Sequence, residues 1–367
     1  MKEIKSILKL YHSYKKNDTK SAIAQVVRLE ESSYRREGAR MLIYDNGTFI
    51  GGISGGCLEG DTLKRSKIAI LKKEASLITY DTSKDDENQI GVGLGCNGVI
   101  DVLITPLSVN LEIISMLERI VDSRKSHVLV IIISQHHPLI PLGNTYYYDV
   151  LKSELENCTN DTLKMKLHDE IQSVLEKKKS KIVQLPFEGN EISAMIEFIP
   201  AQFHLAVYGD NYDVYPLLDF AKVLDWDISL VGNIQKMDKQ KISGIQNLFQ
   251  KDFKQRPNID ERTAIVLMAH DYKTDVENLK ILLASTSSYI GLLGPKKRFD
   301  KIINLFEEEG ISLSEFDKKR IHAPAGLEIG ANTPEEIAAS ICVEIMSSFS
   351  DKEGGKLRNK TGPIHER

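Results

Sequence analysis

The sequence is poor in cysteine and lacks any long apolar run. It has four cysteines among 367 residues, and no two of them form the CxxC spacing of redox and metal-binding motifs. Such scattered cysteines need no disulfide framework, so we expect a reducing, cytoplasmic setting. Charges interrupt the N-terminal stretch too often for the apolar core of a signal peptide. No segment approaches the roughly 20 apolar residues that cross a bilayer, which predicts no membrane association.

The sequence also has no excess of basic residues over acidic ones. The formal net charge is −4, and no basic stripe stands out, which predicts that nucleic acid is not a partner. Hydrophobic residues make up 41% and charged residues 27% of the chain, as in ordinary soluble globular proteins. The length exceeds that of one typical domain, so we expect two.

The pattern of apolar residues predicts two α/β domains of different kinds. Residues 1–199 mix helices and strands, and they include an amphipathic helix from about Cys57 to Lys73. Residues 200–349 alternate short apolar strands with helices, which predicts a Rossmann-like parallel sheet. Residues 350–367 are polar and are expected to form a tail.

The first glycine-rich segment surrounds a cysteine. Ser54, Gly55, Gly56 and Cys57 lie between a predicted strand and a predicted helix. Ser54 suits an N-cap, which would place Cys57 in the first helical turn. There, backbone amides and the helix dipole favour a thiolate or a bound anion. The alternative is a tight turn around an inert, buried cysteine.

A second glycine-rich segment, from Gly91 to Gly98, holds Cys96 directly after Gly95. Two such loops in one domain predict a shared site formed by Cys57 and Cys96. Paired thiols suit a soft metal, a sulfur-rich ligand or a dithiol–disulfide couple. No His or Cys spacing supplies the remaining ligands of a zinc site, so we predict no metal site built from this chain alone.

Three arginines precede the first glycine-rich segment, at Arg35, Arg36 and Arg40. Guanidinium groups bind phosphate oxygens in a forked geometry, so Arg40 is a candidate cofactor-binding residue. The alternative is a solvated basic loop, which applies most directly to Arg36.

The C-terminal half has a poor nucleotide-binding fingerprint. Gly209 follows the first strand, but the later glycines of GxGxxG are missing. Asp210 would repel a pyrophosphate on this loop. The second strand ends in Gly232 and Asn233, where an acidic residue would bind a ribose. NAD or NADP binding is therefore not expected.

Two later loops of this half are richer in candidate residues. Gly294, Lys296 and Arg298 follow a strand and open a helix, and His322 begins an irregular, glycine-rich segment. Their basic groups could meet an anionic ligand at the carboxyl edge of the sheet. The alternative is ordinary turn chemistry with a solvated helix.

Four segments together are similar to the signature segments of the XdhC/CoxI family, and they follow the family's order: GGISGGCLEGD, GLGCNGVIDVLITP, GLLGPKKR and IHAPAGLEIGANTPEEIAASI. The resemblance implies an N-terminal XdhC/CoxI domain, a C-terminal Rossmann-like domain and a homodimer. It further implies a protein that binds the molybdenum cofactor and protects it while its sulfido ligand is installed. A cysteine desulfurase would supply the sulfur, and the apo form of a xanthine dehydrogenase-type molybdenum hydroxylase would receive the cofactor.

The resemblance also implies roles for particular residues. Cys57 and Cys96 would be the catalytic, cofactor-handling thiols. The other implied site residues shape the loops or line the C-terminal site: Gly55, Gly56, Gly95, Gly98, Lys296, Arg298 and His322. These roles predict an accessory protein more than a turnover enzyme. The alternatives are an NAD(P)-dependent oxidoreductase and a thiol redox module.

Overall fold

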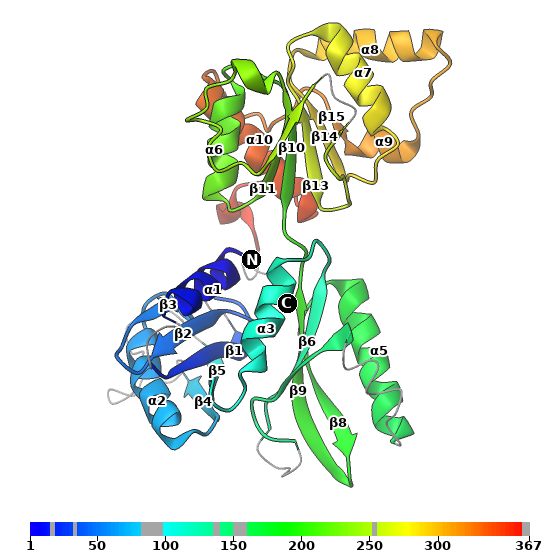
Figure 1. Ribbon diagram of the computed structural model, residues 1–367. Helices are drawn as coiled ribbons and strands as arrows, with labels where there is room; N and C mark the ends of the chain where they lie inside the picture. Colours follow the sequence, from blue (N-terminus) through cyan, green and yellow to red (C-terminus); the bar gives the residue numbers. More distant parts are fainter. Residues whose placement is uncertain are drawn as a thin grey trace. The chain divides into compact units, whose positions relative to one another are not determined.

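The structure is a computed structural model that describes residues 1–14, 19–31, 35–81, 98–134, 140–149, 160–251 and 255–361. The chain forms two compact units, Met1–Ala201 and Gln202–Arg367 (Figure 1). Gly95 and Cys96 of the second glycine-rich segment lie outside the described residues. None of the helices in these ranges combines the length and the apolar character needed to span a bilayer.

The N-terminal unit contains two antiparallel sheets. One has the strand order β3-β2-β1-β5-β4, and the other has the order β7-β6-β9-β8. The strands are β1 (Ser21–Glu31), β2 (Arg40–Tyr44), β3 (Phe49–Gly51), β4 (Ser76–Asp81), β5 (Gly98–Pro106), β6 (His127–Ile132), β7 (Thr145–Tyr147), β8 (Lys181–Phe187) and β9 (Asn190–Ile199). The described helices are α1 (Lys2–Tyr14), α2 (Glu59–Lys72), α3 (Glu112–Val121) and α5 (Asp161–Lys177).

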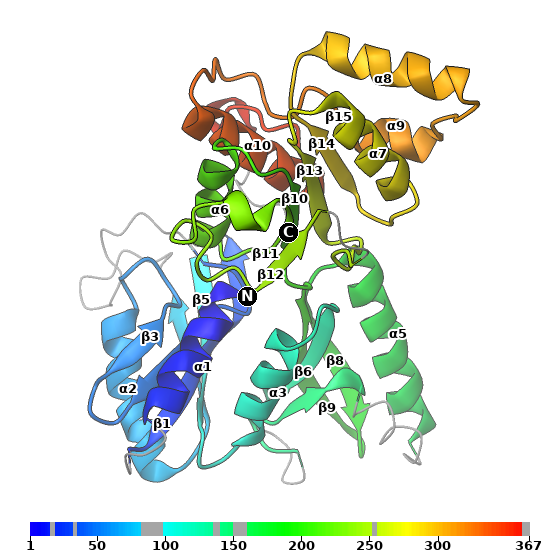
Figure 2. The ribbon, with the colours of Figure 1, turned by 45° about the horizontal axis from the view of Figure 1, so that its top comes forward.

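Helices cover these sheets on several faces (Figures 1 and 2). α2 packs on one face of the five-stranded sheet, where Ile53, Leu58 and Ile70 share a core with strand residues. α1 and α3 share a second core with β1 and β2, and this core includes Leu129 and Met195 of the four-stranded sheet. α5 packs against β8 and β9 in a third core. The first glycine-rich segment therefore lies between β3 and α2, above a packed apolar layer.

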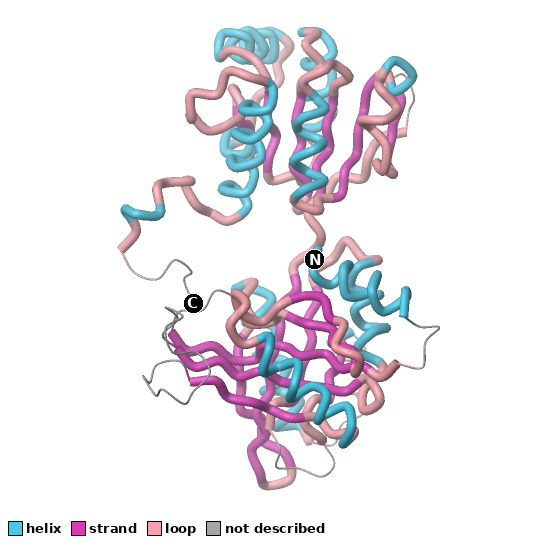
Figure 3. The backbone as a smooth tube through the Cα atoms, turned by 90° about the vertical axis from the view of Figure 1, so that its left-hand side faces the viewer, coloured by secondary structure: helices cyan, strands magenta, loops and turns pink. Residues whose placement is uncertain are grey.

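The C-terminal unit is built on one parallel sheet with the order β12-β11-β10-β13-β14-β15. All its strand pairs are parallel. Figure 3 shows the strands of this unit side by side, flanked by helices. The elements are β10 (His204–Tyr208), α6 (Val214–Val223), β11 (Asp227–Gly232), β12 (Asn247–Gln250), β13 (Thr263–Leu267), α7 (Tyr272–Leu282), β14 (Tyr289–Leu292), α8 (Lys296–Glu308), α9 (Glu315–Arg320), β15 (Ile321–His322) and α10 (Pro334–Phe349).

The packing of this unit confirms the predicted Rossmann-like fold. α6 and α10 share one core with the sheet, and α7 and α8 share the other. A helix connects β10 to β11, β13 to β14 and β14 to β15, as βαβ crossovers of a parallel sheet require. A sheet of this kind offers ligands the carboxyl ends of its strands, where the following loops meet.

Two features of the elements differ from the predictions. α2 begins at Glu59, two residues later than the predicted start at Cys57. In addition, the apolar pattern of the sequence does not predict β7, β12, α9 or β15. They are short, with three residues in β7 and two in β15, so they carry no periodic signal.

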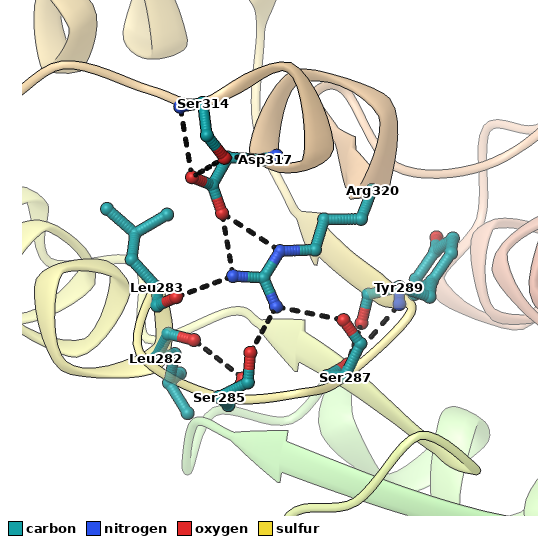
Figure 4. A network of polar contacts seen from close by, with 8 residues as sticks. All are labelled: Leu282, Leu283, Ser285, Ser287, Tyr289, Ser314, Asp317 and Arg320. Carbon is teal, nitrogen blue, oxygen red and sulfur yellow. Dashed lines mark hydrogen bonds and ion pairs between the residues drawn. The ribbon is translucent and has the colours of Figure 1, made fainter.

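Arg320 fixes the start of β15 (Figure 4). Its Nη1 donates to the carbonyl oxygens of Ser285 at 2.7 Å and Ser287 at 2.9 Å, and its Nη2 donates to that of Leu283 at 2.6 Å. Asp317 accepts from both Nε and Nη2. The buried guanidinium thus has several partners, as a buried charge needs, and it ties β15 to the loop after α7.

Candidate functional site

Ser54 organises the loop before α2. Its Oγ accepts hydrogen bonds from the backbone N–H groups of Gly56, Cys57 and Leu58, at 3.3, 3.1 and 3.0 Å. The same hydroxyl donates to Glu59 Oε2 at 2.5 Å. One side chain therefore satisfies three amides that would otherwise lack a partner before the helix. This turn uses the residues up to Leu58, which explains the late start of α2.

Glu59 closes the loop from the other side. Its Oε1 accepts from the backbone N–H groups of Ile53 at 3.2 Å and Ser54 at 2.9 Å. Burial favours the neutral form of Glu59, but the hydrogen bonds from Ser54 and the backbone outweigh it and lower the pKa of this carboxyl. The stabilisation is complete at neutral pH and is lost only as the pH falls through that lowered pKa.

These contacts correct one expectation from the sequence, in which the amides of Gly56 and Cys57 favour a bound anion. In the structure they donate to Ser54, and the residue that precedes α2, Leu58, makes no side-chain cap. The loop is thus held by its own serine, so those amides are occupied within the chain.

Cys57 is a free thiol beside open backbone. It is partly buried and packs against the core beneath α2. Gly55 and Gly56 are exposed. Gly56 has φ +114°, and a Cβ placed there would meet no atom of the described residues within 4 Å, its two chain neighbours aside. A left-handed backbone of this kind favours glycine, so the backbone next to Cys57 carries no side chain on its exposed side.

The strands that flank the second cysteine loop end close to the start of α2. Asp81 ends β4 and pairs with Val99, directly after Gly98. The preceding residue, Tyr80, donates from its hydroxyl to Asp61 Oδ2 at 2.9 Å, and Asp61 lies in the first turn of α2. The first turn of α2, which follows the first glycine-rich loop, therefore lies beside the end of β4 and the start of β5, which flank the second loop. Cys96 itself lies outside the described residues.

Arg40 lies inside the N-terminal unit. Its side chain is 4% exposed and forms an ion pair with Glu197, which is equally buried. Arg40 Nη1 also donates to the carbonyl oxygen of Gly38 at 2.7 Å, and Gln25 Nε2 donates to Glu197 at 3.0 Å. The guanidinium is thus directed at Glu197 of β9, and the predicted role of Arg40 in cofactor binding gains no geometric support.

The C-terminal candidates differ in whether their side chains already have partners within the chain. Arg298 forms an ion pair with the buried Asp275 at 2.5 Å, so its guanidinium is engaged. Lys296 is exposed at the start of α8, after a turn in which Gly294 has φ +124°. His322, at the end of β15, contacts Glu344 and stacks on Tyr289 with ring centroids 4.4 Å apart. Sequence reasoning missed both of these partners of His322.

Loops at the carboxyl ends of β10, β11 and β13 contact one another. Asp210 accepts from the backbone N–H of Asn233 at 2.6 Å. Asn211 Nδ2 donates to the carbonyl oxygen of Ala269 at 3.2 Å. In the ranges that the structure describes, no three His, Cys, Asp or Glu side chains gather closely enough to hold a metal ion. Chemically, the described residues offer the partly buried thiol of Cys57 in one unit and two histidine–carboxylate pairs, His270–Asp213 and His322–Glu344, in the other.

The Ser54 network leads to a testable result. We expect Ser54→Ala to lower the free energy of unfolding by about 1 kcal/mol and to speed maleimide labelling of Cys57, because three amides lose their acceptor. Mass spectrometry after timed labelling locates the modified cysteine. Ser54→Thr keeps the hydroxyl and should behave like the unmodified chain. An unchanged labelling rate in the alanine variant would show that Ser54 does not hold the thiol loop.

Comparisons with known proteins agree with this arrangement. The family model described as XdhC Rossmann domain matches residues 205–345, and the one described as XdhC and CoxI family matches residues 15–81. A probable xanthine dehydrogenase subunit of Bacillus subtilis (strain 168) is 26% identical over 339 residues, which cover 89% of this chain and 93% of that protein. The uncharacterized protein YqeB of Escherichia coli (strain K12) is 33% identical over 89 residues, or 24% of this chain and 16% of that protein.

A solved structure shows the same fold. It is described as a xanthine dehydrogenase from Bacillus halodurans, and it superposes with a TM-score of 0.71 at 23% identity, over 96% of this chain and 98% of that chain. The family models match the thiol-loop region and the parallel sheet in the expected order. From these matches, together with the full-length Bacillus subtilis relative, we conclude that the chain belongs to the XdhC/CoxI family.

Proposed function

We propose that this chain is a maturation protein that binds the molybdenum cofactor and delivers it to a xanthine dehydrogenase-type hydroxylase. The observation that carries the proposal is the thiol of Cys57, held beside bare glycine backbone at the entrance to α2. Family membership supports a maturation role, and the names of the two Bacillus relatives both refer to xanthine dehydrogenase.

The residues around Cys57 fit such cargo. The cofactor is an anionic pterin that carries a phosphate and a dithiolene-bound molybdenum. A thiolate is a soft ligand that suits molybdenum and sulfur chemistry, and the exposed Gly55 and Gly56 beside it carry no side chain that would block a planar ring. The phosphate requires other partners, since the amides of Gly56 and Cys57 already donate to Ser54.

The chain's own residues would hold, shield and release the cargo. Ser54 and Glu59 fix the thiol loop, so that little conformational entropy is lost when Cys57 binds the cofactor. Cys96 would join it from the second loop, whose flanking strands are tied to α2 through Tyr80 and Asp61. We further propose that a cysteine desulfurase supplies the sulfido ligand and that the protein acts as a cytoplasmic homodimer.

The experiment that tests this function is cofactor retention and transfer. The chain, purified from cells that make the molybdenum cofactor, should contain molybdenum and pterin in equal amounts. Mixing it with an apo hydroxylase should transfer both and restore hydroxylase activity. A preparation that contains neither, although the same cells load a hydroxylase, would contradict the proposal. A titration with NAD distinguishes the oxidoreductase alternative, for which we expect no binding because Asp210 occupies the nucleotide loop.

A further inference from the structure

The strand β7 has an open edge in the N-terminal unit. It ends the four-stranded sheet, in which β6 is its neighbour. The backbone N–H of Ile132 in β6 donates to the carbonyl oxygen of Asn144 at 2.9 Å. Backbone groups alternate in direction along an antiparallel strand. The register therefore directs the N–H and C=O groups of Tyr146 toward β6, whereas those of Thr145 and Tyr147 point outward.

The outward backbone groups of β7 have no hydrogen-bond partner in the described part of the chain. Tyr147 is only 5% exposed, and buried backbone groups are paired in nearly all folded proteins. Edge strands are often protected by a proline or a charged side chain. β8, at the other edge of this sheet, contains Pro186 and Lys181, whereas β7 contains neither kind of residue. Its free donors and acceptors, on alternate residues, match those of an added strand.

A hollow borders this edge. Its volume is about 670 Å³, within the range of roughly 300–1,000 Å³ that is typical of binding sites. β7 forms one wall, and α3 with the loop before it forms another. Figures 1 and 2 show α3 beside β6, the neighbour of β7. In the loop before α3, Val109 and Leu111 are 40% and 61% exposed, so the hollow also offers apolar surface.

The two ends of the hollow carry opposite charges. Asn110 Nδ2 donates to the carbonyl oxygen of Gly143 at 3.3 Å, which joins the loop before α3 to the segment before β7. Arg119, late in α3, lies over the Tyr147 ring, 4.4 Å from its centroid. α3 and β7 therefore run in the same direction. Glu112, in the first turn of α3, lies toward the start of β7, and Arg119 lies at its end; both line the hollow.

Both charged groups are available to a ligand. The side chain of Arg119 is 53% exposed, and its ion pair with Asp149 is long, at 4.0 Å. Glu112 is exposed and forms no ion pair with another described residue. The hollow therefore favours a ligand with a negative group at one end and a positive group at the other.

We propose that the open edge of β7 binds an extended peptide segment of a partner protein, in which an acidic and a basic residue are separated by one residue. The segment adds antiparallel to β7, as every other pair in this sheet is antiparallel. Its side chains opposite Thr145 and Tyr147 lie on the face that α3 covers, because Tyr147 shares a core with α3. The acidic residue opposite Tyr147 meets Arg119, and the basic residue that follows extends toward Glu112.

The probe is a fluorescein-labelled peptide, Val-Glu-Val-Lys-Val with blocked termini, titrated with the full chain and followed by fluorescence anisotropy. The matched control, Val-Lys-Val-Glu-Val, has the same composition with the two charges exchanged. We expect the control to bind at least about tenfold more weakly, because both charge pairs become like-charge contacts. Hydrogen exchange resolved to single amides should slow at Thr145 and Tyr147 when the first peptide saturates the chain.

Exchanging the charges of the protein tests the orientation. The double variant Glu112→Lys with Arg119→Glu should reverse the preference between the two peptides, a result that unfolding cannot produce. Glu118→Lys changes an acidic residue of the same helix that contacts His12 of α1, so it should leave both affinities unchanged. Circular dichroism confirms that the variants are folded.

Two results would overturn the proposal directly: equal affinity of the two peptides, and exchange at Thr145 and Tyr147 that the peptide does not slow. Protection that grows with protein concentration alone would assign the edge to a second copy of the chain, and would overturn it as well. The site belongs to the N-terminal unit and needs no cofactor. Its failure therefore leaves the result of the cofactor-retention experiment unaffected.

Discussion

Cys57→Ser is expected to lose most of its bound molybdenum cofactor during purification, with at least a tenfold drop in retained molybdenum and pterin. A serine hydroxyl is a hard, neutral group, whereas the thiolate is a soft ligand. Losing even an outer-shell partner of a metal typically costs about 10- to 100-fold in affinity, so we expect the loss of a direct ligand to cost at least as much. The replacement is nearly isosteric, and Ser54 and Glu59 still hold the loop through backbone groups. Metal analysis and pterin fluorescence of the purified variant measure the effect.

The control for this variant is the other described free thiol. Cys342 is 3% exposed on the inner face of α10, and burial raises its pKa to about 12, so it stays a neutral thiol in the core. Cys342→Ala should cost some stability but no cofactor. If the Cys57 variant retained as much cofactor as the Cys342 variant, the thiol loop would have no part in holding it.

Glu197→Ala is expected to destabilise the N-terminal unit by about 3–5 kcal/mol, the usual cost of leaving a buried charge without its partner. Arg40 would lose its carboxylate, and Gln25 would lose its acceptor, with both groups still buried. Urea unfolding followed by circular dichroism measures the change. Glu30→Ala, which removes one end of the exposed Arg28–Glu30 pair, should change stability by less than about 1 kcal/mol.

A double variant tests whether the effect comes from the unpaired charge. Replacing both partners, as in Arg40→Met with Glu197→Leu, removes the two charges together, and such replacements are often nearly neutral. We therefore expect the double variant to recover most of the stability lost in Glu197→Ala. If Glu197→Ala unfolded at the same urea concentration as Glu30→Ala, the pair would contribute little to the fold.

Local patterns predict the longer strands and helices of the C-terminal unit, whereas β12, α9 and β15 are too short to carry such a signal. Its strands, such as Ala264 to Leu267, are short apolar runs between helices, so periodicity and chain order define the βαβ units without knowledge of distant contacts. The same holds for the first glycine-rich loop, because Gly56 marks a left-handed backbone position that its neighbours cannot supply.

Long-range pairing is what the sequence cannot provide. Its local pattern predicts that Arg40 binds phosphate, but the partner of Arg40, Glu197, lies 157 positions away in the chain. His322 is a candidate from sequence, whereas Glu344 and Tyr289, which fix its ring, come from other elements of the fold. Ser54 is predicted as the N-cap of α2. In the structure its hydroxyl accepts from the amides of Gly56, Cys57 and Leu58. It therefore stabilises the turn before α2, and the helix begins only at Glu59.

The hydrogen bond between Tyr80 and Asp61 has a mechanical consequence. Burial is the main cause that raises the pKa of the Tyr80 phenol to about 12, so this donor keeps its proton throughout the physiological range. The start of α2 and the end of β4 are therefore joined by a hydrogen bond whose donor stays protonated over the physiological pH range. The first turn of α2, which follows the Cys57 loop, therefore cannot move away from the end of β4 unless that hydrogen bond breaks.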